Sequence, residues 1–311
     1  MNIDTYKRYN SLSNFYKEKY GRKVAKISLN ANFTCPNKDG KKGYGGCIYC
    51  SNSGSGDFAG DKDKSLIEQF FDIKKNMDKK WPNSLYIPYL QANSNTYGSI
   101  EKLKETYEPL LKIKDIVGIS IATRSDCFNE EIYQYLAAIN QKVPVQIELG
   151  LQSANQETTA FLNRQETNEE FIKCVNRLHE IGIEIVVHII NGLPNETEID
   201  MLNTIKFINK LPINGIKIHS LLVLKNTKLG NLYLEKPFSL LTLNQYVEIT
   251  VKQLEILRPD IIIHRLAADG VKDDLIAPLW TQKKLVVMNE IDKLLSKKDS
   301  HQGILYSGNE K

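Results

Sequence analysis

Three of the chain's five cysteines lie within residues 35–50, in the stretch CPNKDGKKGYGGCIYC. Cys47 and Cys50 form a C-x-x-C pair, and Cys35 precedes them across a loop rich in lysine and glycine. Three thiolates can hold three irons of a [4Fe–4S] cluster and leave the fourth iron open to another ligand. Glycines let the backbone fold closely around such a group, and lysines offset its negative charge. The stretch therefore predicts an iron–sulfur site with one open position.

Other interpretations of these cysteines stay open. A structural zinc site needs four ligands, so Cys127, Cys174 or His188 would have to complete it from distant parts of the chain. A thioredoxin-like C-x-x-C opens a helix and needs no third cysteine. A metal-independent hydrolase is a further alternative, with Glu148 and Asp126 as its acid–base pair.

The overall composition is that of an ordinary globular protein. The 311-residue chain is 41% hydrophobic and 25% charged, and its net charge of +4 is too small to indicate a nucleic-acid partner by itself. No apolar run reaches the roughly 18 residues of a membrane span, and the first residues show no apolar signal segment. We therefore expect a cytoplasmic protein without a membrane partner, whose clustered cysteines serve a metal or catalysis rather than disulfides.

Short β-rich runs alternate with amphipathic helical stretches along most of the chain. The predicted strands are 23–30, 84–91, 115–123, 143–152, 183–191 and 215–223. The predicted helices between them are 63–79, 99–111, 129–140, 168–181 and 197–210. This alternation favours right-handed crossovers and a parallel sheet. The α/β units predict a partial TIM-like (β/α)6 barrel, and a flat doubly wound sheet is the alternative.

The chain is expected to divide into four segments. Residues 1–22 form a basic and aromatic helical extension, 23–223 the barrel, 224–296 a C-terminal α/β extension that closes it, and 297–311 a flexible tail. The C-terminal extension has predicted helices at 242–257 and 281–295 and a strand-like run at 260–268. Reactive groups of such barrels lie at the C-terminal ends of the strands. Because the cysteine stretch follows the first predicted strand, it is expected at this face.

The cysteine stretch resembles the cluster loop of the radical S-adenosylmethionine (SAM) enzymes. The long spacing between Cys35 and Cys47 is similar to the spacing found in the branch that contains the elongator catalytic subunit. From about residue 20 to residue 285 the chain resembles the small bacterial YhcC/YtqA-type radical SAM proteins, which lack the elongator's acetyltransferase domain. The strings that carry this resemblance are YLQANSNTY (89–97), IATRSDC (121–127), ELGLQS (148–153), HIINGLPNET (188–197), and HRLAADG (264–270) with LIAPLW (275–280).

The resemblance implies both the cofactors and the chemistry. Cys35, Cys47 and Cys50 would ligate a [4Fe–4S] cluster, whose fourth iron takes the amino and carboxylate groups of SAM. One electron, from a flavodoxin- or ferredoxin-type donor, would then cleave SAM to methionine and a deoxyadenosyl radical that abstracts hydrogen from a substrate. Tyr49, between the paired cysteines, would lie against the adenine, with a ring that caps the core as the alternative.

Polar residues on two predicted strands are further candidates for holding SAM. Glu148 and Gln152 share one face of the fourth strand, and we expect them to hold the ribose or amino group. At the end of the third strand, Arg124 could grip the SAM carboxylate bidentately, with Asp126 beside it. The alternative for each is an internal hydrogen bond or ion pair, such as Arg124–Asp126 or Arg124–Glu148.

Two loops add weaker SAM candidates. Many radical SAM enzymes carry a Gly-Gly-Glu string after the second strand, whereas this chain has QANSNT (91–96). Gln91 and Asn95 could take over its contact with the SAM amino group, or they could be ordinary polar loop residues. Gly192, in NGLP (191–194), would let the backbone approach the adenine, or it could belong to a plain strand-to-helix turn.

The substrate is less well indicated. His188, His219 and Arg265 are candidates for substrate contact, although a lone histidine in a strand is often a satisfied core residue. Basic and aromatic residues alternate over 6–23, which suits RNA contact or simply a solvated face. Because the elongator branch modifies tRNA wobble uridines, the resemblance implies a tRNA substrate and a downstream modifying enzyme. A zinc-stabilised, non-catalytic RNA-binding protein is the alternative, as is a radical SAM enzyme that acts on a small molecule or protein.

Overall fold

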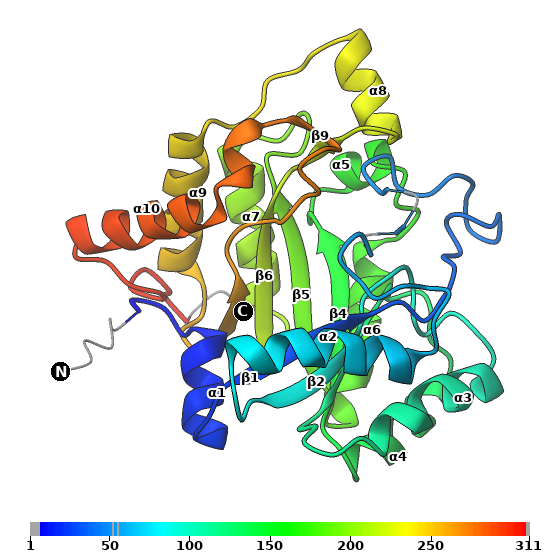
Figure 1. Cartoon of the computed structure of the whole chain (residues 1–311). Coiled ribbons are helices and arrows are strands. Elements are labelled where there is room, and N and C mark those ends of the chain that lie inside the picture. Colours follow the sequence, from blue (N-terminus) through cyan, green and yellow to red (C-terminus); the bar gives the residue numbers. More distant parts are fainter. Residues whose placement is uncertain (1–6, 52, 55, 309–311) are drawn as a thin grey trace.

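A computed structural model describes residues 7–51, 53–54 and 56–308 of the chain. Its centre is a curled sheet of seven parallel strands in the order β1-β2-β3-β4-β5-β6-β8 (Figure 1). The strands are β1 (Val24–Leu29), β2 (Leu85–Leu90), β3 (Ile119–Thr123), β4 (Val145–Gln152), β5 (Glu184–Asn191), β6 (Gly215–Ser220) and β8 (Ile262–Arg265). The predicted partial barrel is confirmed, and the flat-sheet alternative is wrong.

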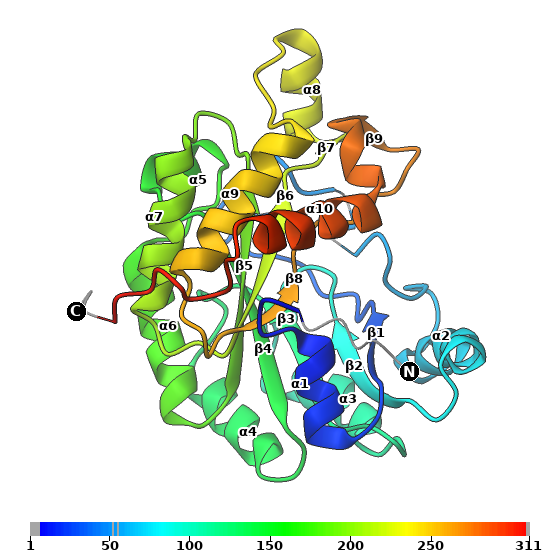
Figure 2. The same ribbon diagram turned by 90° about the vertical axis from the view of Figure 1, so that its left-hand side faces the viewer.

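Helices cover the outside of this sheet, except α8, which lies beyond its end (Figure 1). They are α2 (Leu66–Lys80), α3 (Ile100–Leu111), α4 (Glu130–Asn140), α5 (Gln156–Phe161), α6 (Asn168–Glu180), α7 (Glu198–Asn209), α8 (Lys228–Glu235), α9 (Leu243–Ile256) and α10 (Lys284–Lys297). Helices α9 and α10 pack side by side on the C-terminal part of the barrel (Figure 2). Helix α1 (Leu12–Tyr20) contacts both edge strands, β1 and β8, and so lies along the open side of the barrel.

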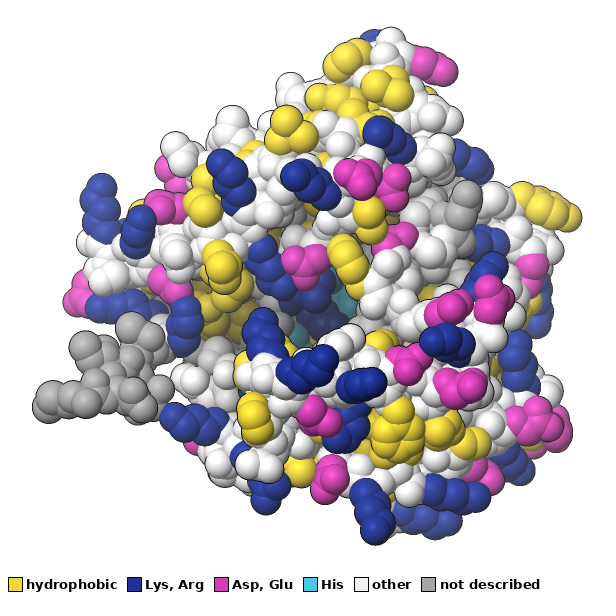
Figure 3. Space-filling view, in the orientation of Figure 1, with side chains coloured by type: hydrophobic (Ala, Val, Ile, Leu, Met, Phe, Trp, Pro, Cys, Tyr) yellow, Lys and Arg dark blue, Asp and Glu magenta, His cyan; other side chains and the backbone are white. Residues whose placement is uncertain are grey.

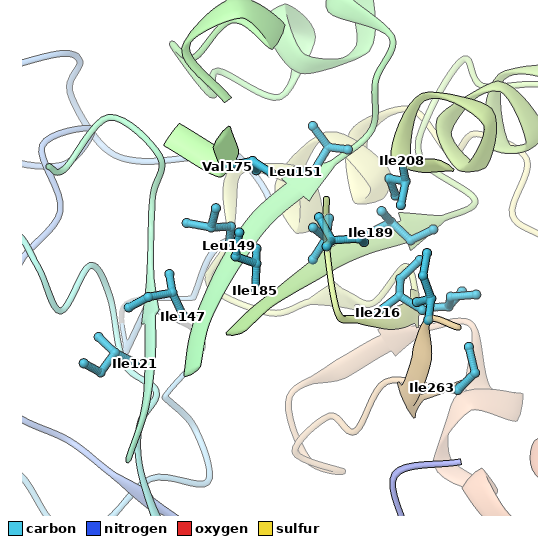
Figure 4. Close-up of a cluster of buried hydrophobic side chains, with 14 of the residues drawn as sticks. Ile121, Ile147, Leu149, Leu151, Val175, Ile185, Ile189, Ile208, Ile216 and Ile263 are labelled. Carbon is cyan, nitrogen blue, oxygen red and sulfur yellow. The ribbon is translucent and has the colours of Figure 1, made fainter. Parts of the chain in front are cut away.

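The two faces of the sheet differ in polarity, and this difference creates the site. On the outer face Ile147, Leu149, Ile185 and Ile189 are at most 1% exposed and pack toward the helices (Figure 4). Burying each such side chain stabilises the fold by roughly 1.5–3 kcal/mol. Because successive side chains of a strand point to opposite faces, the polar residues between these apolar ones point into the barrel.

Local capping fixes where the helices begin. Helix α6 starts with a capping box, in which the Thr167 side chain accepts from the backbone of Glu170 and the Glu170 side chain accepts from the backbone of Thr167. The same arrangement opens α7 with Thr197 and Asp200. Because these reciprocal bonds fix the first turn, α6 and α7 begin within one residue of the starts predicted from the helical periodicity.

The structure differs from the expected elements in several places. The run at 260–268 supplies β8, which joins the main sheet beside β6. The predicted strand 215–223 is split: β6 ends at Ser220, and β7 (Val223–Leu224) pairs antiparallel with β9 (Leu275–Ala277) in a small separate ribbon. The short helix α5, which follows β4, was not predicted at all.

The segment after α10 makes hydrogen bonds to the rest of the fold. Gln302 is buried, and its side chain donates to the carbonyls of Arg258 (2.7 Å) and Ile261 (2.9 Å). The backbone N–H of Leu305 donates to the carbonyl of Glu255 at 2.8 Å. These contacts tie residues 302–305 of the expected tail to α9 and to the turn that follows it. Residues 309–311 of that tail and residues 1–6 of the N-terminal extension lie outside the described residues.

Candidate active site

The three clustered cysteines meet at one cavity. Cys35, Cys47 and Cys50 line a cavity of about 750 Å³ that extends into the barrel, and all three are free thiols. A backbone hydrogen bond from Cys50 to the Cys47 carbonyl (3.0 Å) closes the turn of the pair. Gly46 has a φ of +72°, a conformation that favours glycine, and its carbonyl accepts from the Asn163 side chain at 2.9 Å. The glycines therefore shape the loop that carries the thiols.

The donor set consists of three cysteine thiols, which is the number that a [4Fe–4S] cluster with one open iron requires. Among the residues that the structure describes, no three His, Cys, Asp or Glu side chains could hold one metal ion, so the zinc alternative finds no ligand set there. A cubane holds its thiolates further apart than a single ion does. The amide of Asn37 donates to Cys47 Sγ at 3.5 Å, and hydrogen bonds to sulfur tune the potential of such clusters.

Arg164 is a site residue that the sequence analysis missed. It follows α5, is only 4% exposed, and donates to the Tyr49 hydroxyl (3.3 Å) and the Gly150 carbonyl (2.6 Å). It also pairs with Glu166. Burial raises the pKa of Tyr49 well above its ordinary value, so Tyr49 remains a neutral phenol. The arrangement holds the Tyr49 ring at the cavity wall, beside the cysteines.

Arg124 and Asp126 form the internal ion pair that the sequence left open as an alternative. Two parallel hydrogen bonds of 2.8 Å join the guanidinium to the carboxylate, and Arg124 also donates to the Arg164 carbonyl at 2.9 Å. Burial opposes ionisation of Asp126, but the contacts with Arg124 outweigh it and lower the carboxyl pKa. Arg124 lines the cavity, whereas Asp126 is not among the described lining residues.

Glu148 lies at the centre of a buried charge network. Its Oε1 atom contacts Lys26 Nζ (2.5 Å) and accepts from the Ser120 hydroxyl (2.9 Å). Its Oε2 atom pairs with Lys217 and with His188 Nε2 (2.7 Å). Burial alone would raise the pKa of Glu148, but Lys217 and Lys26 outweigh it and hold that pKa well below its usual range. Glu148 is thus a fixed anion between two lysines, neither of which the sequence analysis identified.

The three substrate candidates line the same cavity. His188 and His219 have ring centroids 5.2 Å apart, and Arg265 contacts Asp269 at 3.3 Å. Burial, reinforced by Lys217, lowers the pKa of His188 to about 4, and burial lowers the pKa of His219 well below its ordinary value. Both imidazoles are therefore neutral near pH 7.

The remaining SAM candidates separate into two groups. Gln91 and Gln152 line the cavity, whereas Asn95 and Gly192 are not among its described lining residues. The buried Asn95 amide donates to the carbonyls of residues 90, 92 and 122 at 3.1, 3.0 and 2.9 Å. Gly192 has a φ of +84°, and a Cβ there would lie 3.1 Å from Leu241. Asn95 thus ties β2 to β3, and Gly192 makes a tight turn after β5.

The aromatic residues of the N-terminal extension are less available than the sequence suggested. Tyr9 and Tyr16 are 7% and 6% exposed and belong to hydrophobic clusters. Their rings cannot stack on nucleic-acid bases in this conformation.

None of the helices in the described part of the chain combines the length and the apolar character that a membrane span requires.

Similarity to known proteins identifies the class. Residues 40–208 match the sequence model of the Radical SAM superfamily, and residues 213–297 match that of the Radical_SAM C-terminal domain. The chain belongs to the radical SAM superfamily and is a radical SAM enzyme. Its cofactors are those of that family, a [4Fe–4S] cluster and SAM, as the resemblance implied.

Individual relatives narrow this identification to the YhcC/YtqA type. The chain is 42% identical to the uncharacterized protein YtqA of Bacillus subtilis over 300 residues, which cover 96% of this chain and 93% of the relative. It is 28% identical to YhcC of Escherichia coli, with 89% of each chain covered. The resemblance to this type of protein is confirmed.

Two further similarities are more distant. The archaeal Methanocaldococcus infernus Elp3, with an N-terminal deletion, superimposes with a TM-score of 0.68 at 16% identity, over 90% of this chain and 64% of that chain. The tRNA-2-methylthio-N(6)-dimethylallyladenosine synthase of Fusobacterium nucleatum is 26% identical over 46% of this chain and 34% of its own length. The first similarity supports the fold alone.

Proposed function

We propose that Cys35, Cys47 and Cys50 hold the [4Fe–4S] cluster and that the enzyme modifies a base of tRNA. The observation that carries the first part is that three free thiols line the same cavity as the polar interior of the barrel. When bound, the cluster and SAM supply the reactive radical; the protein supplies position and exclusion of water.

The residues around the thiols are suited to hold SAM in position and to exclude water. The Tyr49 ring, fixed by Arg164, offers a flat surface for the adenine. Gln91 and Gln152 present amide groups to the cavity for the polar atoms of SAM. Leu221, Leu222 and Leu275 line it with apolar surface and keep water from the reacting atoms. Arg124 acts here as scaffold, because Asp126 already occupies its fork.

Two observations support a tRNA substrate. A relative whose name describes a tRNA-modifying synthase shares sequence with nearly half of the chain. Lysine and arginine side chains surround the hollow at the centre of the molecule (Figure 3), where they could contact nucleic-acid phosphates. A flavodoxin- or ferredoxin-type protein would supply the electron, and a further enzyme would act on the product.

A direct test is anaerobic reconstitution with iron and sulfide, followed by dithionite and SAM. The proposal predicts release of deoxyadenosine, its loss in Cys47→Ala, and its retention in Cys174→Ala, which removes a buried thiol of α6 that does not line the cavity. Equal deoxyadenosine release by the parent and Cys47→Ala would contradict the assignment of the ligands.

The substrate needs a separate experiment. Mass spectrometry of tRNA nucleosides from anaerobically grown cells with and without the protein should show one modified nucleoside replaced by its precursor. An unchanged nucleoside profile would refute the tRNA proposal and leave the cluster proposal untouched.

A further inference from the structure

The interior of the cavity carries more positive than negative groups. Seven lysines and arginines line the cavity, against three aspartates and glutamates. Arg124 and Arg164 are neutralised by Asp126 and Glu166, which lie just outside the lining. Five basic side chains then remain against three acids. Burial lowers the pKa of one of them, Lys217, to about 7, so at least four of the five are cationic near pH 7. Figure 3 shows Lys, Arg and His side chains gathered in this hollow.

The acids cannot compensate this excess. Both oxygens of Glu148 are filled, by Lys26 and Ser120 on one side and by Lys217 and His188 on the other. Asp269, the other acid near the inner wall, is shared: it contacts Arg265 at 3.3 Å and Lys284 at 2.7 Å. Arg265 therefore has one long contact with a carboxylate that is more closely bound to another cation.

A neutral imidazole, that of His219, lines the same cavity as this cation. His219 Nε2 is buried and has no hydrogen-bond partner among the described residues, although a buried polar atom normally has one. Arg265, His188, His219 and Lys217 all line the same cavity, and the ring centroids of His188 and His219 lie 5.2 Å apart. The group thus contains one buried nitrogen without a partner among the described residues, His219 Nε2, and one guanidinium, that of Arg265, with a single long carboxylate contact.

We propose that Arg265, His219 and Lys217 form an oxyanion-binding subsite that receives a carboxylate or phosphate group of the substrate. An oxyanion accepts hydrogen bonds from Arg265 and His219, and its negative charge offsets the excess positive charge near Lys217. This inference deepens the proposed function, since it gives the chemical class of a group that the substrate must carry. It concerns binding alone and involves no step of the radical reaction.

Saturation-transfer NMR on the anaerobic holoenzyme tests the subsite with small probes. Acetate represents a carboxylate, methyl phosphate a phosphate monoester, and methanol serves as the neutral control. We expect saturation transfer to at least one anion and none to methanol at the same concentration. A preference for acetate identifies a carboxylate-bearing substrate, and a preference for methyl phosphate identifies a phosphate-bearing one.

Variants connect this binding to the named residues. Arg265→Gln and His219→Phe should each weaken binding of the preferred anion about tenfold, because each removes a hydrogen-bond donor from the subsite. Arg265→Lys keeps the charge and should bind more tightly than Arg265→Gln. Arg177→Gln, on the outer surface of α6, where Arg177 pairs with Glu130 and Glu180, is the matched control and should bind like the parent.

The outcome that overturns the subsite is absence of anion binding, or binding that Arg265→Gln and His219→Phe leave unchanged. Deoxyadenosine release by the same preparation is measured in parallel. Anion binding without deoxyadenosine would refute the proposed function alone, whereas deoxyadenosine without anion binding would refute the subsite alone.

Discussion

Replacing Glu148 with glutamine should destabilise the protein far more than an ordinary isosteric change. Glu148 is 1% exposed and is the counterion of Lys26 and Lys217. With an effective dielectric constant of about 20, the 2.5 Å contact with Lys26 alone has a gross Coulomb energy of about 7 kcal/mol. Desolvation offsets part of this energy, and breaking a buried pair by removing one partner typically costs about 3–5 kcal/mol. We expect Glu148→Gln to lower the free energy of unfolding by about 3–5 kcal/mol.

A double-mutant cycle identifies the cause of the loss. Lys217→Met alone should cost less than Glu148→Gln, because the carboxylate keeps Lys26, Ser120 and His188. The double variant also lacks Lys217, which Glu148→Gln alone leaves without its carboxylate. The loss of unfolding free energy in the double variant should therefore be about 2 kcal/mol smaller than the sum of the two single losses. The assay is anaerobic urea unfolding of the holoprotein, followed by circular dichroism.

Two results would refute this reasoning. A loss below about 1 kcal/mol in Glu148→Gln would mean that water or relaxation screens the lysines, as at an exposed ion pair. Strictly additive effects in the double variant would mean that Glu148 and Lys217 do not interact energetically.

Two further predictions concern residues away from the charge network. Burial raises the pKa of Glu196 to about 7 from an ordinary 4.5, so the folded state binds this proton more tightly than the unfolded state does. The shift corresponds to about 3 kcal/mol of stability. This stability is fully present below pH 4.5 and is lost as the pH rises through 7. The free energy of unfolding should therefore fall over this range relative to Glu196→Gln, and parallel pH profiles of the two proteins would contradict the assignment. Asn95→Ala should lower the free energy of unfolding by about 2–4 kcal/mol because it leaves buried carbonyls without a donor, whereas Asn231→Ala on the exposed face of α8 should change it by less than about 0.5 kcal/mol. Weakened SAM binding in a fully stable Asn95→Ala protein would show instead that Asn95 holds the cofactor.

The sequence predicted the barrel well because its signals are local. Strands β1 to β6 each lie within a predicted run, since apolar periodicity and the turns that bound each run depend only on neighbouring residues. The α5 helix was missed because its six residues are too few to show a period. The β7–β9 ribbon was missed because its strands are very short and lie far apart in the chain.

The site was predicted only in part, for a different reason. Glu148, Gln152 and the three cysteines were identified from strand alternation and from spacing, and all line the cavity. Lys26 and Lys217 have a comparable signal, because each is a lysine in the middle of an apolar strand, where burial requires a partner.

Arg164 and Arg124 show what the sequence could not decide. Arg164 lies in a loop without periodicity, and only the fold brings it to Tyr49. For Arg124 the sequence offered SAM, Asp126 or Glu148 as the partner. The two 2.8 Å hydrogen bonds to Asp126 are a tertiary fact that spacing alone does not determine.

The central claim is that three thiols hold a cubane with one open corner for SAM. Its most direct test is iron analysis with electron paramagnetic resonance of the anaerobically reconstituted, dithionite-reduced protein. We predict about four irons per chain, a reduced-cluster signal that changes when SAM is added, and loss of both iron and signal in Cys35→Ala but not in Cys127→Ala. One zinc per chain without iron, or a cluster that survives Cys35→Ala, would contradict the account.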